Sequence, residues 1–425
     1  LLLNIEYKNF ELIVIDQSSD VEDLQDIYQD IQQELNDKFT LLTHDQASYA
    51  EMVNLAASRA AGKLIAVVSS TSQAVNGNWL TELVSQMHGD NVGMVGARVV
   101  SEEDVIVHAG GVLGISNDIS GQFSGQIISE PGYMQRAHLV QEYTSVSSAC
   151  FLIQTQLLNQ VGGLDTDVLT NSRYCITDLC LKVKNSGMRL IWTPYATVFQ
   201  DEKLAMESNG VAVFTDDDLA EKELLKRWPE AYRSDVSYNR NLTLKYSDFS
   251  VETESVLGWS EQYHDRLRVL AFPFNSVGNG EYRVRAPLRA LAHEAMIETT
   301  LLANHEFRTD NYVPTRFEVH RANPDVLLLQ NTLSDQDYEF LKQIKAETNI
   351  FTIFGIDDLS DQVPKKSSRK QLIFRDMKHR LRRTLALCDR VIVTTQSIAD
   401  AYSEYHDDIV VVPIYLEQLR WQQVS

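Results

Sequence analysis

Short apolar blocks alternate with longer amphipathic blocks over the first part of the chain. Continuous apolar runs bounded by turn residues predict buried strands at 10–15, 39–43 and 64–68. Apolar residues at a spacing of three and four predict helices over 21–35 and 47–61, the second capped by Gly62. Because helices and strands alternate, we expect an α/β fold in which helices cover a parallel sheet.

The run at 64–68 suits a strand covered on both faces, and the polar turn Ser69, Ser70 and Thr71 follows it. In open α/β sheets ligands bind beyond the carboxyl ends of the strands, so a binding site is expected at this turn. Asp16 ends the first predicted strand in the same way. It is well placed to hold a base or ribose, and a helix cap for 21–35 is the alternative.

The pattern then continues to about residue 200. Helices are expected at 79–87 and 174–185, and strands at 92–100 and 189–199, the last running into Gln200. His108 is a candidate ligand, although a histidine hydrogen-bonded near a turn is the favoured interpretation. A polar, acidic stretch at 251–266 predicts a linker.

A second α/β series follows the linker, beginning with a strand that ends at Phe272. Gly278 and Gly280 lie in a loop that leads into a helix, where a glycine lets the backbone approach a phosphate or sugar. Tyr282 and Arg283 follow in the same segment. Asp357 and Asp358 end a later strand, where a turn or helix cap is expected rather than a metal site.

The net charge of −21 over 425 residues argues against a broad nucleic-acid or anionic-membrane surface. The basic stretch 365–383 is the local exception: a solvated helix face is the default interpretation, and contact with a membrane surface or a lipid-diphosphate acceptor is the alternative. The four cysteines lack zinc spacing and are expected to be buried thiols. No apolar run reaches the roughly 20 residues needed to span a bilayer, so we expect a cytoplasmic location, with peripheral contact at the inner membrane face.

Residues 1 to about 251 resemble the GT-A domain of family 2 glycosyltransferases, in particular the branch of bacterial O-antigen and rhamnan-type polysaccharide assembly. The stretches that carry the resemblance are YKNFELIVIDQSSD, NLAASRAAGKLIAVV, NWLTELV, VGMVGARVV, HAGGVLG, CFLIQTQLLNQVGGLD, DLCLKVKNSGMRLIWTPYATVF and WPEAYRSDVSYNRNLTL. The resemblance implies a nucleotide-sugar donor. It also implies manganese or magnesium, held by an Asp-x-Asp-like motif at the turn that here contains Ser69 and Thr71. The resemblance further implies a strand before Leu1.

The catalytic positions of the family hold other residues in this chain. Its general base falls on Ile176, two residues before Asp178, and its metal-contacting histidine falls on Gln200. Hydroxyl and amide groups are weak ligands for a hard divalent cation, so we assign no metal cofactor and predict no ordinary metal-dependent chemistry. An unusual metal site built from the hydroxyls with Asp201 or Glu202 is the alternative. The nucleotide-binding residues that the resemblance implies are Asp16, Ser18, Asp20, Ser69 and Thr71.

Residues 268–421 resemble the N-terminal, acceptor-side half of a family 4 GT-B glycosyltransferase. The resemblance rests on SVGNGEYRVRAPLRALAHEA, IDDL and CDRVIVTT. It implies a loop site at Gly278, Gly280, Tyr282 and Arg283, and a donor half beyond Ser425. The expected domains are therefore 1–250, a linker at 251–266, and 267–425.

The leading hypothesis is a glycosyltransferase polypeptide that transfers a sugar from a nucleotide sugar to a glycan or lipid-linked acceptor. The rival is a non-catalytic module that binds a nucleotide or glycan beside a partner transferase. A Rossmann dehydrogenase is a third alternative, but no G-x-G-x-x-G motif follows the first strand. No nucleic-acid partner is expected.

Overall fold

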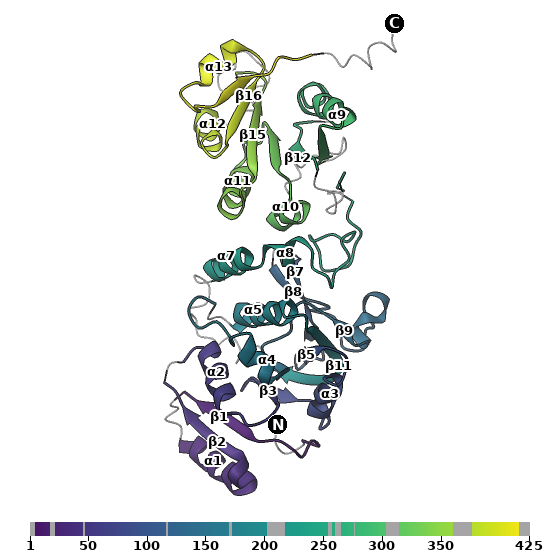
Figure 1. Ribbon diagram of the computed structural model, residues 1–425, viewed down its shortest axis with the longest axis vertical. Coiled ribbons are helices and arrows are strands. Elements are labelled where there is room, and N and C mark those ends of the chain that lie inside the picture. The colour runs from purple at the N-terminus through teal and green to yellow at the C-terminus, as the bar shows by residue number, and fades with distance from the viewer. Residues whose placement is uncertain are drawn as a thin grey trace. The chain divides into compact units, whose positions relative to one another are not determined.

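The computed structural model places two compact units, Leu1–Ser250 and Val251–Ser425 (Figure 1). It describes residues 5–17, 22–45, 47–115, 118–169, 172–201, 217–253, 257–259, 265–275, 277–302, 314–359 and 376–415. Both units combine helices with sheets that contain parallel strands, which confirms the predicted α/β class.

The first unit begins with a small parallel pair of strands. β1 (Leu12–Asp16) pairs in register with β2 (Phe39–Thr43), and α1 (Glu22–Leu35) with the short η2 (Asn36–Lys38) connects them. Figure 1 shows this pair at one end of the unit with α1 beside it. The predicted strands and helix are confirmed here, although Ile27 on the expected apolar face of α1 is 50% exposed.

The main sheet of this unit is mixed. Its strands follow the order β3 (Leu64–Val68), β10 (Cys150–Gln154), β5 (Val92–Val100), β11 (Arg189–Gln200) and β4 (Ser72–Ala74). β6 (Ile106–His108) joins β5, β9 (Gln141–Glu142) joins β11, and β7 (Gly111–Ile115) pairs with β8 (Asp118–Gly121) in a separate ribbon.

Two expectations for β3 are wrong. β3 pairs antiparallel with β10 instead of extending the parallel β1–β2 pair, because its hydrogen-bonded partner comes from a segment more than eighty residues later. Its two faces are not both covered either, since Ala66 is exposed. Within the described residues β10 is the one strand paired with β3, so β3 is an edge strand of its sheet.

Helices pack around this sheet. They are α2 (Tyr49–Arg59), α3 (Trp79–Gln86), η3 (Tyr133–His138), α4 (Thr155–Gln160), α5 (Ser172–Asn185), α7 (Asp217–Arg227) and α8 (Pro229–Arg233). A capping box of Ser48 and Glu51 starts α2. The helix ends at an extended Ala60, so the prediction that Gly62 caps it is wrong. Trp79 and Leu83 of α3 pack with Val95, Val99 and Leu152 of the sheet in one apolar cluster.

The second unit is built on six parallel strands in the order β13 (Ile297–Leu301), β12 (Leu267–Phe272), β14 (Val326–Gln330), β15 (Phe351–Ile356), β16 (Arg390–Val393) and β17 (Ile409–Val411). The chain runs from β12 to β13 on one side and then to β14 on the other, so the order reverses between β12 and β14. Ligands of open parallel sheets bind at this kind of switch point.

Alternate residues of these strands face two different layers. One face packs against α10 (Arg316–Ala322), α11 (Asp335–Glu347), α12 (Met377–Leu385) and α13 (Gln396–Tyr402). The other packs against the π-helical turn η4 (Glu281–Arg285) and α9 (Ala286–His293). Trp259, within the range predicted as a linker, is buried in the first of these cores. Among the described residues, no helix is both long and apolar enough to cross a membrane.

Candidate functional site

The three residues at the expected metal positions come together at the carboxyl end of β3. The hydroxyls of Ser69 and Thr71 lie 2.9 Å apart, and the backbone N–H of Thr71 donates to Ser69 Oγ at 3.3 Å. Gln200 Nε2, from the end of β11, donates to Thr71 Oγ1 at 3.3 Å. The structure therefore assembles one neutral hydrogen-bonded cluster from residues 129 positions apart in sequence.

The backbone fixes this cluster in place. The N–H of Ser69 donates to the carbonyl of Ala149 at 2.9 Å, which ties the turn to the start of β10. Ser72 pairs with Gln200 in the β4–β11 ladder, and the N–H of Asp201 donates to the carbonyl of Thr71 at 3.2 Å. Both sides of the cluster are thus held by strand pairing, and side-chain motion alone would not separate them.

The side chains in this cluster do not fit a divalent metal. Hydroxyl and amide groups carry no charge, and Mg²⁺ or Mn²⁺ at such a site requires carboxylates. Across the part of the chain that the structure describes, no three His, Cys, Asp or Glu side chains are grouped so that they could hold a metal ion. We therefore derive no metal-assisted step at this site.

Asp16 stands at the end of β1. Its backbone carbonyl accepts the N–H of His44 at 3.0 Å. Burial, and then the Asp16 carboxylate that accepts its hydroxyl, raise the pKa of Tyr28 in α1. The predicted nucleotide-binding residues Ser18 and Asp20 lie outside the described residues.

A hydrogen bond connects α2, the helix that follows β2, to the segment before β10 of the main sheet. The hydroxyl of Tyr49, at the start of α2, donates to the carbonyl of Ser148 at 2.9 Å, one residue before the partner of Ser69. The start of α2 is thus joined to the segment that leads into β10.

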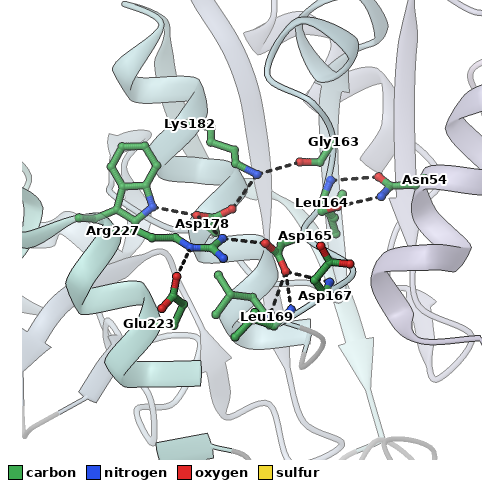
Figure 2. A network of polar contacts seen from close by, with 12 residues as sticks. Asn54, Gly163, Leu164, Asp165, Asp167, Leu169, Asp178, Lys182, Glu223 and Arg227 are labelled. Carbon is green, nitrogen blue, oxygen red and sulfur yellow. Dashed lines mark hydrogen bonds and ion pairs between the residues drawn. The ribbon is translucent and has the colours of Figure 1, made fainter. Parts of the chain in front are cut away.

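The position expected for a catalytic base lies in the protein interior. Ile176 is 1% exposed and Asp178 is fully buried on α5. Figure 2 shows the Asp178 carboxylate beside Lys182 and Arg227. Trp228 Nε1 donates to it at 2.8 Å, Lys182 Nζ lies at 2.7 Å and Arg227 Nη1 at 3.8 Å. Asp178 cannot reach a substrate, and its contacts anchor α7 and α8 to α5.

The same network holds the loop before α5. Asp165 accepts backbone hydrogen bonds from Asp167, Val168 and Leu169 and an ion pair from Arg227 at 2.7 Å. Partial burial opposes ionisation, but the N–H groups of Leu169 and Val168 and the Arg227 guanidinium outweigh it and hold the pKa of Asp165 well below its usual range. The Asp165 carboxylate therefore stabilises the loop through these contacts.

A glycine in this loop is fixed by its surroundings (Figure 2). Gly163 has a φ of +70°, and an added Cβ would lie 2.6 Å from Asn54 Oδ1. The Asn54 amide in α2 needs that space, because it pairs with both the carbonyl and the N–H of Leu164 at 2.8 and 3.0 Å. The loop therefore joins α2, through Asn54, to α5, through Lys182.

The second unit has a polar cluster at its switch point. Arg283 Nε donates to Asp357 Oδ1 at 3.1 Å, and Gln330 Nε2 donates to Asp357 Oδ2 at 2.7 Å. Gln330 is the last residue of β14 and Asp357 the first after β15, so both lie at the carboxyl edge of the parallel sheet. The Asp357 side chain is therefore a buried partner of Arg283, a role that the expected turn or helix cap did not include.

The glycine loop adjoins this cluster. Gly280 approaches Asn275 so closely that an added Cβ would lie 1.9 Å from the Asn275 carbonyl oxygen, and Gly278 has a φ of +54° with open space around its Cβ position. Arg283 is buried and Tyr282 is 39% exposed. Gln330 also donates to the carbonyl of Asn279 at 3.3 Å. The sequence pointed to the loop and to Arg283, but gave no signal for Gln330, because its role depends on strand order.

Burial raises the pKa of Asp357, and the hydrogen bonds from Gln330 and Arg283 only partly offset it. Within the described residues, Arg283 Nη2 is buried with no hydrogen-bond partner, while Nη1 donates to the carbonyl of Val412 at 2.6 Å. The cluster thus couples the ends of β14, β15 and β17 to the glycine loop.

Both units have an α/β fold with polar side chains at the carboxyl ends of strands. Residues 1–159 match the model of the family Glycosyl transferase family 2. This match supports the resemblance to family 2 glycosyltransferases over residues 1–159.

Individual proteins are similar to the chain over longer stretches. An uncharacterized protein, y4gI, of Sinorhizobium fredii is 31% identical over 249 residues, which are 57% of this chain and 27% of that protein. The O-antigen biosynthesis protein RfbC of Myxococcus xanthus is 25% identical over 300 residues, 69% of this chain and 22% of that protein. The chain thus spans about a quarter of the length of these relatives. Among solved structures, the mannosyltransferase PcManGT of Pyrobaculum calidifontis, in complex with GDP-Man and Mn²⁺, is similar with a TM-score of 0.36 and 15% identity, over 55% of this chain and 58% of that one.

Proposed function

We propose that this chain is part of a glycosyltransferase of bacterial surface polysaccharide assembly, in which the first unit does not perform metal-dependent sugar transfer. The observation that carries the proposal is the neutral cluster of Ser69, Thr71 and Gln200 in a family 2 domain. The similarity to an O-antigen biosynthesis protein supports the setting.

The chemical reason is the leaving group. Transfer from a nucleotide sugar releases a diphosphate, and a divalent cation stabilises its developing charge. Neutral hydroxyls cannot bind that cation tightly. The acceptor hydroxyl would also need a base, and the base position holds the buried Ile176. Both halves of the reaction thus lack their catalytic group in the first unit.

We assign acceptor binding to the second unit. Gly278, Gly280, Tyr282 and Arg283 lie at its switch point, next to the buried Asp357. This edge of the sheet combines amide, carboxylate and guanidinium groups with the exposed Tyr282, a set of groups that would suit a polyhydroxylated acceptor. In this proposal the transfer reaction takes place in a complete protein of which the chain is one part, on a glycan or lipid-linked acceptor and with a nucleotide sugar as donor.

A location at the cytoplasmic face of the inner membrane is part of this proposal. The basic stretch 365–383 would provide the contact, and its residues 365–375 lie outside the described part of the chain. In α12, Arg380 and Arg383 both pair with Asp335, which leaves Lys378 and Arg382 as the cations in that helix better suited to meet a membrane.

The alternative is a non-catalytic nucleotide- or glycan-binding module beside a partner transferase. The burial of both Ile176 and Asp178 favours it for the first unit, because neither side chain can act as a base on a substrate.

Calorimetry tests the proposal. The chain is titrated with UDP, GDP and dTDP, each with and without Mn²⁺, alongside a Ser69→Asp, Thr71→Asp variant. We expect no manganese-dependent nucleotide binding by the unmodified chain and some gain in the variant. Manganese-dependent binding by the unmodified chain would refute the proposed loss of metal chemistry.

A further inference from the structure

We propose that the carboxyl edge of β3 in the first unit binds a neutral carbohydrate, through the hydroxyl–amide cluster of Ser69, Thr71 and Gln200, rather than a nucleoside diphosphate. The inference rests on the proposed function, because it assumes that no metal bridges this edge to a phosphate. It goes further by naming the class of ligand.

The cluster is accessible. Ser69, Thr71 and Gln200 are each half-buried, and Ser70 between the two hydroxyls is exposed. A ligand can therefore reach the polar atoms without opening the strand ladder that holds them. Partial burial also lowers the local dielectric, which strengthens each hydrogen bond made there.

The internal hydrogen bonds leave a donor and an acceptor for a ligand. Thr71 Oγ1 accepts from Gln200, and Ser69 Oγ accepts from the backbone of Thr71. If the Thr71 hydroxyl donates its hydrogen bond to Ser69 Oγ, then the Ser69 O–H can donate to a ligand and the Gln200 carbonyl oxygen can accept from one. Neither group has another partner among the described residues. A donor beside an acceptor is complementary to the vicinal hydroxyls of a sugar, each of which both donates and accepts.

The charges at this edge disfavour a diphosphate. β1, β2, β3, β5 and β11 end at Asp16, Thr43, Val68, Val100 and Gln200. The described residues among these and the two that follow each of them include no lysine or arginine. Phosphate recognition without a metal depends on guanidinium or ammonium groups. The described strand ends provide none, whereas a neutral sugar needs none.

One further polar atom lies in the same turn. Ser72 is 6% exposed and its Oγ has no hydrogen-bond partner within the described residues. Its backbone N–H donates to the carbonyl of Ser69 at 3.0 Å, so it adjoins the cluster. A buried hydroxyl without a partner is uncommon in proteins, and a bound sugar hydroxyl or a water would satisfy it.

Saturation-transfer NMR and calorimetry on the full chain test the proposal. The probes are the methyl glycosides of glucose, galactose, mannose, rhamnose and N-acetylglucosamine, and UDP and GDP are run in parallel, all with EDTA and again with Mn²⁺. We expect at least one glycoside to bind with an affinity that EDTA does not change, and no nucleotide to bind in EDTA.

Matched variants locate the binding. Thr71→Val keeps the shape of the side chain and removes its hydroxyl, and Ser69→Ala does the same at the neighbouring position. Each should weaken glycoside binding about three- to tenfold, the effect of one neutral hydrogen bond. Thr40→Val and Ser85→Ala, at exposed positions of β2 and α3, are the controls and should change nothing.

The outcomes separate the two proposals. If no glycoside binds to the folded chain, or if Thr71→Val and Ser69→Ala both bind as the unmodified chain does, the carbohydrate site is refuted while the loss of metal chemistry stands. Metal-free nucleotide binding that Thr71→Val weakens would also refute it. Manganese-dependent nucleotide binding would overturn the proposed function itself.

Discussion

Replacement of Asp178 by asparagine separates a structural role from a catalytic one. Asp178 is fully buried, and its carboxylate contacts Trp228, Lys182 and Arg227. An asparagine side chain at this position would keep an acceptor for the indole but lose the charge. We expect the first unit to lose stability, because two cations then face a neutral amide.

The magnitude follows from the partners. Removal of one member of a buried ion pair costs about 3–5 kcal/mol. The side chains of Lys182 and Arg227 are 25% and 28% exposed, and Arg227 keeps its pair with Asp165, so solvent and that second carboxylate recover part of the loss. We therefore expect a cost of about 2–3 kcal/mol for D178N, below the range for a fully buried pair. In a unit of this size that lowers the melting temperature by roughly 4–12 °C.

The assay is thermal unfolding followed by tryptophan fluorescence, with Lys182→Met as the matched variant. Lys182→Met removes one partly exposed partner and should cost about 1 kcal/mol or less. D178N that melts within a degree of the unmodified chain would refute the structural assignment. It would then be necessary to treat Asp178 as an accessible group.

Three further predictions concern other sites. Burial lowers the pKa of His108 to about 4, so between its unfolded value near 6.5 and pH 4 the unfolded chain binds more protons than the folded chain. The free energy of unfolding should therefore fall by up to about 3 kcal/mol as the pH is lowered from about 6.5 to about 4. Urea unfolding of His108→Phe should lack this dependence. Glu347→Gln removes the carboxylate that pairs with the buried Arg316 at 2.9 Å and should lower the free energy of unfolding by about 3 kcal/mol. The loss should appear as faster hydrogen exchange in α11, and unchanged exchange would show that the pair contributes little. Gly280→Ala places a Cβ 1.9 Å from the Asn275 carbonyl oxygen and should lower the melting temperature of the second unit, while Gly278→Ala, with open space, should do so less.

Local patterns in the sequence were sufficient for many elements. The apolar runs at β1, β2 and β3 and the periodicity of α1 and α2 depend on neighbouring residues, and the structure has these elements close to their predicted bounds. The predicted end of α2 was wrong because the chain leaves the helix at Ala60 in an extended conformation. A glycine cap requires a residue in the left-handed conformation, and the sequence does not distinguish such a glycine from an ordinary loop glycine.

Strand partners were beyond local reasoning. β3 is apolar like an interior parallel strand, yet it pairs antiparallel with β10 and exposes Ala66. The decision between these arrangements depends on a strand that begins at Cys150. For the same reason Gln330 gave no signal: a glutamine at a strand end becomes part of a site only when β15 places Asp357 beside it.

The candidate site of the first unit shows how far a resemblance combined with geometry can be taken. Ser69, Thr71 and Gln200 were identified as substituted positions one at a time, and the structure then shows that they contact one another. A random loss of ligands would leave unrelated side chains around a void. Here a hydroxyl pair and an amide, held in place by strand pairing, form hydrogen bonds with one another. Ile176 is separately buried in α5, so within the described residues the expected base position and this polar cluster are two distinct features of the first unit, and the proposed binding role rests on both.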